Sequence, residues 1–448
     1  MAKHWITMAK LGFVMLLMIG TAGTAAADNR SDSGAVYTMT NSTTGNAVVV
    51  YARAADGTLM LSGTFPTGGT SIGFFATGNQ NGVLLSDDGH CLWAVNSMSN
   101  SISAFKVKGT SLSLINVIGS GGQRPISLAV NEDLGILYVL NAGGQIQHSP
   151  QYSDNVKGFT LGEDCALSSL PGSTRALNAP TVYPGVSPAQ VSFNPAGSVL
   201  VVTEKTNNGG VRGGNIVTFI VRGDGLLTSP KSFAMPCGTG NTACPVTEPF
   251  GFAFDNSGQL LVTAADCTTP ALPGNLPGCT VPPDQPSLLS YTLTRDGTLT
   301  LVDALADNQA AKCWIVITNS QQRDGEPSQK DHGGLNEFAF TVNAIATQAG
   351  GTPGSPPAGS VTGYQVSPGG SLTDLGVTPI PLEPVGVPVD AALSRNSRFL
   401  YVLSEGDGSI SAFKVGLDGS LTLLNTYAVT TPPAITTNGP FPNGLAAR

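Results

Sequence analysis

A short pattern that occurs seven times constrains the fold of this chain more than any other feature. Each copy begins with an aromatic residue in an alternating stretch and continues through a tight turn, most often Asp-Gly. A leucine follows eight positions after the aromatic, or seven in the second copy. Two short strands around such a turn form a β-hairpin. The aromatic residues that begin the copies are Tyr51, Phe105, Phe159, Phe219, Tyr291, Tyr364 and Phe413.

A second pattern lies upstream of most hairpins: an apolar strand, a turn, and another apolar strand that ends in a polar residue. Examples are 84–96, 128–141, 191–204, 252–265 and 391–404. With the hairpin, this pattern gives four antiparallel strands per unit, which is one blade of a β-propeller. The two inner strands are expected to be apolar on both faces and the outer hairpin to alternate. A β-solenoid would have a shorter period and a β-sandwich would not repeat seven times, so the sequence predicts an all-β, seven-bladed propeller.

The irregular copies indicate how the ring closes. The first unit opens at 35–41 with what is the second strand elsewhere, so its inner strand is missing. Residues 438–448 have the lead-in and apolar stretch of an inner strand, which predicts that the C-terminal strand completes blade 1 and protects both sheet edges. In blade 6 a polar insert separates 312–318 from 338–343, as expected of a surface loop.

The first residues have the features of a secretory signal peptide. Lys3 and Lys10 precede an apolar run over 11–19, and small residues lead to Ala27. We therefore expect a signal peptide over 1–27 and one propeller domain over 28–448, secreted, periplasmic or at the cell surface. The alternative is a membrane anchor, but the run has about half of the ~20 residues that a span needs. With a net charge of −8 and no basic cluster, the chain has no electrostatic footprint for nucleic acid.

An exported chain can oxidise its cysteines, of which this chain has seven. Short separations favour local bridges between Cys237 and Cys244 and between Cys267 and Cys279, although spacing does not fix the pairing. Because seven is odd, at least one thiol is free or pairs between chains, and we expect Cys313 to be buried and free. No Cys/His spacing indicates zinc, and we expect no metal and no cofactor.

The stretch 393–424 and its degenerate copies resemble the lactonase-type seven-bladed propeller family. That family includes 6-phosphogluconolactonase-like proteins and 3-carboxy-cis,cis-muconate cyclases, and the resemblance is to its secreted bacterial members. The stretch 137–141 also resembles the YVTN-type repeats of surface-layer propellers. Such a resemblance implies fold strongly and chemistry weakly. Family members carry histidines where inner strands begin, whereas the corresponding stretches here, 123–126, 188–190 and 249–251, contain none.

One face of a propeller carries the loops that enter each inner strand and leave each second strand, and its residues surround the central channel. On this face we predict Glu204 and Arg124 as a pair that binds, or abstracts a proton from, an organic acid or lactone. His148 is a third candidate acid or base. The alternative for Glu204 and Arg124 is a purely structural hydrogen bond or strand cap. The other predicted ligand-binding residues are Asn141, Gln190, Lys205, Phe250, Asp266, Trp314, Asp390 and Glu405.

Two functions from different classes remain open. The first is an exported module that binds a small organic acid, a lactone or an extracellular protein; the missing histidines favour it. The second is an enzyme of the lactone hydrolase or muconate cyclase kind, which the family resemblance favours. A monomer that does not insert into a membrane is expected in both cases.

Overall fold

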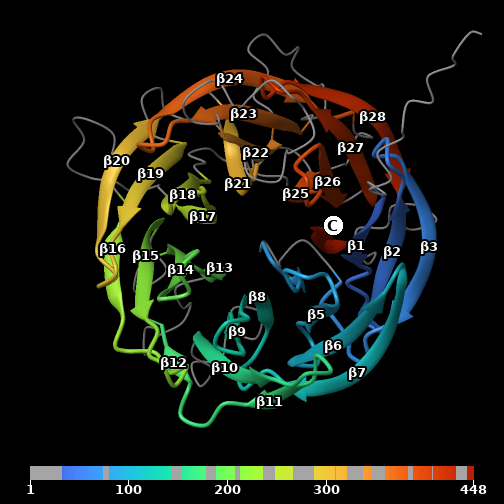
Figure 1. The fold of residues 1–448 in the computed structure, drawn as a ribbon, viewed down its shortest axis with the longest axis vertical. Helices are drawn as coiled ribbons and strands as arrows, with labels where there is room; N and C mark the ends of the chain where they lie inside the picture. Colours follow the sequence, from blue (N-terminus) through green and yellow to red (C-terminus); the bar gives the residue numbers. More distant parts are fainter. Residues whose placement is uncertain are drawn as a thin grey trace, which may run out of the picture. The chain divides into compact units, whose positions relative to one another are not determined.

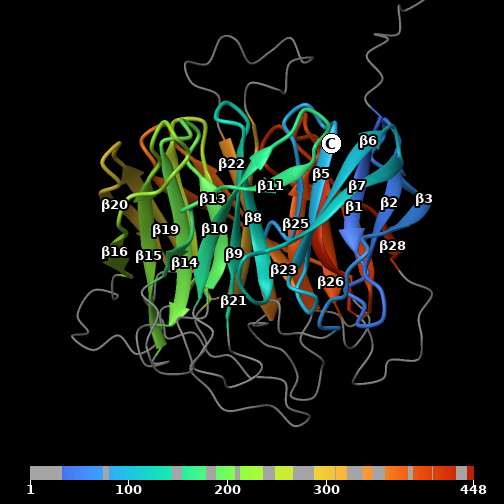
Figure 2. The same cartoon turned by 90° about the horizontal axis from the view of Figure 1, so that it is seen from below.

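The computed structural model describes residues 33–73, 80–143, 154–177, 188–206, 212–235, 248–265, 287–307, 309–319, 337–345, 359–381, 387–405, 407–429 and 441–448. Within the unit Ser33–Arg448, these residues form seven antiparallel sheets set radially around one axis (Figure 1). The strands of each sheet run roughly along that axis, as the view from the side shows (Figure 2). The predicted seven-bladed, all-β propeller is confirmed. No helix in the described part of the chain is long and apolar enough to cross a membrane.

Each blade is numbered in chain order, and its strands are given from the axis outward. Blade 1 has β29 (Asn443–Ala447), β1 (Gly34–Met39), β2 (Ala47–Arg53) and β3 (Leu59–Pro66); blade 2 has β4 (Val83–Leu85), β5 (Cys91–Asn96), β6 (Ser101–Lys108) and β7 (Ser111–Gly119). Blade 3 has β8 (Pro125–Asn131), β9 (Ile136–Asn141), β10 (Asn155–Leu161) and β11 (Leu167–Ser169), with β12 (Arg175–Ala176) also on β10; blade 4 has β13 (Pro188–Phe193), β14 (Val199–Thr206), β15 (Arg212–Ile220) and β16 (Lys231–Ala234). Blade 5 has β17 (Pro249–Phe254), β18 (Gln259–Ala264), β19 (Leu288–Leu293) and β20 (Leu299–Leu305). Blade 6 has β21 (Ala310–Ile317), β22 (Glu337–Ile345), β23 (Ser360–Val366) and β24 (Leu372–Pro379). Blade 7 has β25 (Val387–Leu393), β26 (Phe399–Glu405), β27 (Ser409–Val415) and β28 (Leu421–Ala428).

The hydrophobic core lies between neighbouring blades, which explains the repeated aromatic residue. All seven aromatic residues that begin the hairpin pattern are buried. Further aromatic side chains of the second strands bond to the hairpin turn of the next blade: Tyr138 Oη donates to Gly225 O at 2.8 Å, and Tyr401 Oη to Gly57 O at 2.9 Å. The expected alternation of the outer hairpin is wrong in detail. Third strands such as β27 are almost wholly buried, whereas fourth strands such as β24 are mostly exposed, because only the fourth strand lies at the rim.

Blade 1 is built from both ends of the described chain, as the sequence predicted. Strand β29 pairs antiparallel with β1, with Val36 opposite Ala447 and Thr38 opposite Leu445. Arg448 extends the contact, because its backbone exchanges hydrogen bonds with Ala35 and its Nη1 donates to Gly89 O of blade 2 at 2.8 Å. Figure 1 shows the C-terminus beside β1, at the inner end of blade 1. The ring is therefore closed by strand pairing.

A disulfide joins blades 2 and 3 between Cys91 and Cys165, and the spacing argument missed it. The hairpin repeat does contain a sequence signal for this disulfide. In the third copy Cys165 stands where Gly57, Gly225 and other copies have glycine, and it adopts the left-handed backbone conformation of those glycines, with φ 76°. The left-handed conformation is strained for a residue with a Cβ, so a cysteine at this position indicates a special role. Cys313 is buried and free, as expected.

Two double variants test this reading of Cys165. Cys91→Ser with Cys165→Ser should destabilise the protein by about 2–4 kcal/mol, since it loses the cross-link. Cys91→Ser with Cys165→Gly should lose less, by roughly 1 kcal/mol, because glycine adopts the left-handed turn without strain. Chemical denaturation of both variants measures the difference. Equal stabilities would contradict the view that Cys165 holds a glycine position.

Candidate functional site

The candidate site lies on the face where inner strands begin and second strands end, here called the entry face. The register places these ends together: Pro125 pairs with Asn141, Pro188 with Glu204, and Pro388 with Ser404. Residues at the same level of different blades are therefore neighbours around the axis. The predicted site residues that the structure describes all lie at this level.

Two cations from neighbouring blades interact on the entry face. Arg124 precedes β8 with a left-handed backbone, φ 55°, and its backbone N–H donates to Asn100 Oδ1 at 2.7 Å. Burial lowers the pKa of Arg124 to about 10, against the opposing charge of Asp154. Burial also lowers the pKa of Lys205 to about 8, and the Arg124 guanidinium adds to this, while Glu248 opposes it. Arg124 and Lys205 thus form a cationic pair balanced by carboxylates of blades 3 and 5.

An aromatic wall lies beside the cationic pair. Lys205 Nζ lies 4.7 Å from the centroid of the Phe250 ring, and Phe250 packs edge-on against Trp314 with centroids 5.3 Å apart. Both rings are nearly buried, so they form the wall between blades 4, 5 and 6. Burial raises the pKa of the neighbouring Cys313 thiol to about 12, which keeps it protonated at neutral pH. The predicted residues Lys205, Phe250 and Trp314 are therefore brought together.

Gln190 and Asp390 do not join the cationic pair or the aromatic wall, because their polar atoms form hydrogen bonds between the inner strands of adjacent blades. Each is the third residue of its inner strand, counted from the proline. Gln190 exchanges two hydrogen bonds with the backbone of Phe252, at 2.7 and 2.9 Å. Asp390 Oδ2 accepts from Leu445 N at 2.8 Å, and burial raises its pKa well above the usual range. At the corresponding position of blade 3, Ser127 Oγ accepts from Val191 N at 3.2 Å.

In blade 5 the third residue is Gly251, and a side chain from elsewhere takes its place. Gln80 Nε2 donates to Ile315 O at 2.7 Å, and Gln80 Oε1 accepts from Ile315 N at 3.3 Å. The Gln80 carbonyl accepts from Ser127 Oγ of blade 3 at 2.6 Å. Because blades 3 and 6 are not neighbours, Gln80 spans the axis of the ring, and Figure 1 shows the blue chain near β5 reaching toward its middle. A Cβ on Gly251 would lie 2.6 Å from the backbone oxygen of Cys313 and 2.8 Å from Gln80 Oε1, and the backbone contact requires glycine there.

The remaining described candidates are buried at the ends of second strands. Asn141 Nδ2 donates to Ser120 O at 3.2 Å and to Asn155 Oδ1 at 3.0 Å, which holds the end of β9. Glu204 is fully buried, and Asn215 Nδ2 lies 3.5 Å from its Oε2. Burial raises the pKa of Glu405 to about 8, and no group in the described ranges hydrogen-bonds its Oε2.

Several predictions fall outside the described residues: His148, Asp266, and the cysteines Cys237, Cys244, Cys267 and Cys279. Sequence reasoning did not single out Gln80, Asp154 or Glu248. The sequence signal for the two carboxylates is their position, since Asp154 directly precedes a third strand and Glu248 directly precedes the proline of an inner strand. Within the described ranges, no group of three or more His, Cys, Asp or Glu side chains could hold a metal ion.

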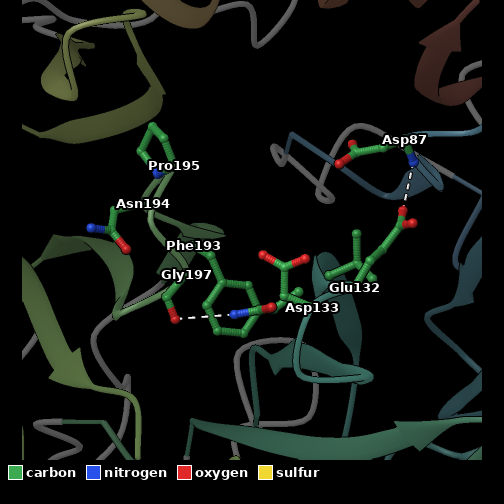
Figure 3. A pocket seen from close by; sticks show the side chains of 9 residues that line it. Asp87, Glu132, Asp133, Phe193, Asn194, Pro195 and Gly197 are labelled. Atoms are coloured by element: carbon green, nitrogen blue, oxygen red, sulfur yellow. Dashed lines mark hydrogen bonds between the residues drawn. The ribbon is translucent and has the colours of Figure 1, made fainter.

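A separate pocket of about 120 Å³ lies at the opposite end of the inner strands, among the turns of blades 2, 3 and 4. Figure 3 shows Asp87 and Glu132 on one side and Phe193 to Gly197 on the other. Glu132 Oε1 accepts from the Asp87 backbone, and Asn131 Nδ2 donates to Gly197 O at 3.0 Å. These bonds tie neighbouring blades together. The pocket lies away from the cationic pair and the aromatic wall.

Comparison with known proteins agrees with this architecture. Residues 31–160 match the family model described as "Lactonase, 7-bladed beta-propeller". A proposed 6-phosphogluconolactonase from Bacteroides fragilis is similar in structure, with 18% identity, a TM-score of 0.58, and 93% of this chain and 98% of that chain covered. The periplasmic gluconolactonase of Pseudomonas aeruginosa is similar with 14% identity, a TM-score of 0.57, and 89% and 97% covered. No curated protein matches the chain in sequence. At these identities the structural likeness shows the fold alone, a seven-bladed β-propeller, and residues 31–160 are similar to the lactonase propeller family.

Proposed function

We propose that this protein is an exported binding module whose entry face takes a small organic acid or lactone. The observation that carries the proposal is the cationic pair of Arg124 and Lys205 beside the Phe250 ring. A guanidinium binds a carboxylate through two parallel hydrogen bonds, and a partly dehydrated ammonium adds a second charge-assisted bond. The Phe250 and Trp314 rings, nearly buried themselves, form an apolar boundary on one side of the cationic pair.

Export is part of this proposal. The predicted signal peptide over 1–27 supports it, and so does the Cys91–Cys165 disulfide, because such bonds persist in oxidising compartments. The similar Pseudomonas aeruginosa protein is described as periplasmic.

The cationic pair is tested by removing one charge at a time. Arg124→Asn suits the left-handed backbone, since asparagine tolerates positive φ, and Lys205→Met keeps the length of the side chain. Each should raise the Kd for a bound carboxylate or lactone about tenfold or more, by the loss of a charge-assisted hydrogen bond. Calorimetry with a panel of small organic acids and lactones measures this. Binding by the wild type should also weaken as pH rises through about 8, where Lys205 loses its proton.

The control is Lys106→Met, which removes the same charge from an exposed position on β6. It should bind like the wild type. If the Lys205 and Lys106 variants lose affinity equally, the effect comes from net charge and the site is wrong. If no acid or lactone in the panel binds the wild type, the proposed ligand class is wrong.

Lactone hydrolysis is the second candidate function, and the family match over 31–160 favours it. In this case Glu204 acts as a general base that activates water, and Arg124 stabilises the oxyanion that forms on the carbonyl. Glu204→Gln keeps the shape of the side chain and removes the base. If the wild type hydrolyses a lactone, Glu204→Gln should lower the turnover at least about a hundredfold and retain binding. This result would favour the enzyme and contradict the binding module.

A further inference from the structure

Blade 6 contains a fully buried lysine where four other blades have proline. Lys312 occupies the position of Pro125, Pro188, Pro249 and Pro388, as the pairing of each with its second strand shows. Its side chain is 0% exposed. Strand β21 places it directly opposite Asn343 of β22. An amine and a primary carboxamide therefore face each other on adjacent strands, away from water.

The contacts around this lysine are short and polar. Lys312 Nζ lies 3.2 Å from Asn343 Oδ1, 2.6 Å from Asp307 Oδ2 and 2.8 Å from Tyr364 Oη. The Tyr364 hydroxyl also bonds Asp307 Oδ2, and Ser287 Oγ bonds Asp307 Oδ1 at 2.7 Å. Asp307 is 4% exposed. The amine, the amide and a carboxylate thus share one enclosed space.

Each group has the role that an acyl transfer requires. Burial lowers the pKa of Lys312 against the opposing charge of Asp307, which favours loss of the ammonium proton. Asp307 is in position to accept that proton as a general base. The Asn343 amide nitrogen donates to the Ser360 and Thr362 hydroxyls, each at 2.9 Å, so hydroxyl groups stand beside the leaving nitrogen. Fixed neighbours of this kind react with effective molarities that reach about 10⁵ M or more.

We propose that Lys312 and Asn343 form an intramolecular isopeptide bond in the folded protein. Lys312 Nζ attacks Asn343 Cγ, a new N–C bond forms, and the C–N bond of the carboxamide breaks. Asp307 takes the proton of the lysine ammonium, and a proton passes to the leaving nitrogen. The lysine ammonium and the carboxamide become a secondary amide and an ammonium ion, so atoms and charge balance without an oxidant or a further reactant.

The cross-link would fasten β21 to β22 at the entry face and close the chain between 312 and 343 into a covalent loop. It is independent of what the cationic pair binds. Asn141 of blade 3 faces Pro125 instead of a lysine, and Asn96 of blade 2 lies beyond the residues of β5 that pair with β4. Within the described residues, blade 6 is therefore the blade where the reaction is expected.

The experiment is the intact mass of the purified, reduced wild-type protein under denaturing conditions. The mass should be lower than the sequence requires by one ammonia molecule. After digestion, tandem mass spectrometry should find a branched peptide that joins Lys312 to Asn343. A wild type at its full sequence mass would overturn the proposal, and because this measurement needs no variant, misfolding cannot obscure it.

Variants assign the roles. Lys312→Arg keeps the positive charge but replaces the amine with a non-nucleophilic guanidinium, so it should show its full mass. Lys205→Arg, a matched change elsewhere on the entry face, should still lose ammonia. Asp307→Asn should react slowly or not at all. If Lys312→Arg still loses ammonia, the ammonia comes from another site and the proposed cross-link is wrong. If Asp307→Asn reacts fully, Asp307 is not the general base.

Discussion

Deleting residues 438–448 is expected to destabilise the protein by more than about 5 kcal/mol, a loss comparable to the whole stability of many domains. The deletion removes β29, the inner strand of blade 1, and leaves β1 with an unpaired edge. Asp390 loses the Leu445 N–H that its Oδ2 accepts, and Leu445 no longer fills the core beside blade 7. Thermal melts followed by circular dichroism should show a Tm lower by about 5 °C or more, or no cooperative transition.

A trans-complementation control separates ring closure from general damage. A synthetic peptide of residues 438–448 added to the truncated protein should restore part of the lost Tm, because it can pair with β1. Arg448→Ala, which removes the side-chain bonds to Gly89 O and Gly109 O but keeps β29, should cost only about 1–2 kcal/mol. A truncated protein that melts like the wild type would refute closure by strand pairing.

Glu405→Gln is expected to make the protein more stable at pH 8, by up to about 4 kcal/mol. Burial raises the pKa of Glu405 from 4.5 to about 8 in the folded state, so between these values the folded protein holds a proton that the unfolded chain has lost. Stability therefore falls as pH rises through this window. Burial shifts the pKa of Asp390 in the same direction. Glutamine cannot ionise, so the variant should lose less stability between pH 5 and pH 8.

Chemical denaturation of the wild type and the variant at pH 5 and pH 8 measures this difference. Glu163→Gln, an isosteric change at an exposed position, is the matched control and should follow the wild type. Equal losses in the wild type and in Glu405→Gln would show that folding does not raise the pKa of Glu405.

The architecture was predictable because the repeat is local. An aromatic, a turn and a leucine within nine residues define a hairpin, and seven hairpins define the ring. The missing inner strand of blade 1 even predicted the pairing of β29 with β1. The Cys91–Cys165 bridge was visible in the same repeat as a cysteine at a glycine position, but spacing alone pointed to other cysteines.

The site was predictable in place but less so in detail. The entry face followed from the topology, and Arg124, Lys205, Phe250 and Trp314 do gather there. Gln190 could not be distinguished from a ligand-binding residue, because its partner is the backbone of another blade, 62 positions away. Gln80 was harder still, since its role depends on a glycine in blade 5 and a backbone group in blade 6.

The two-ended construction of blade 1 has a consequence for biosynthesis. Strand β1 is made first and β29 after every other strand of the ring. Until then the nascent chain carries an open strand edge whose intended partner does not yet exist, and such edges pair readily with other chains. The β29 of a second molecule would satisfy that edge equally well, giving an exchanged dimer. We therefore expect the yield of closed monomer to depend on keeping unfinished chains apart during synthesis.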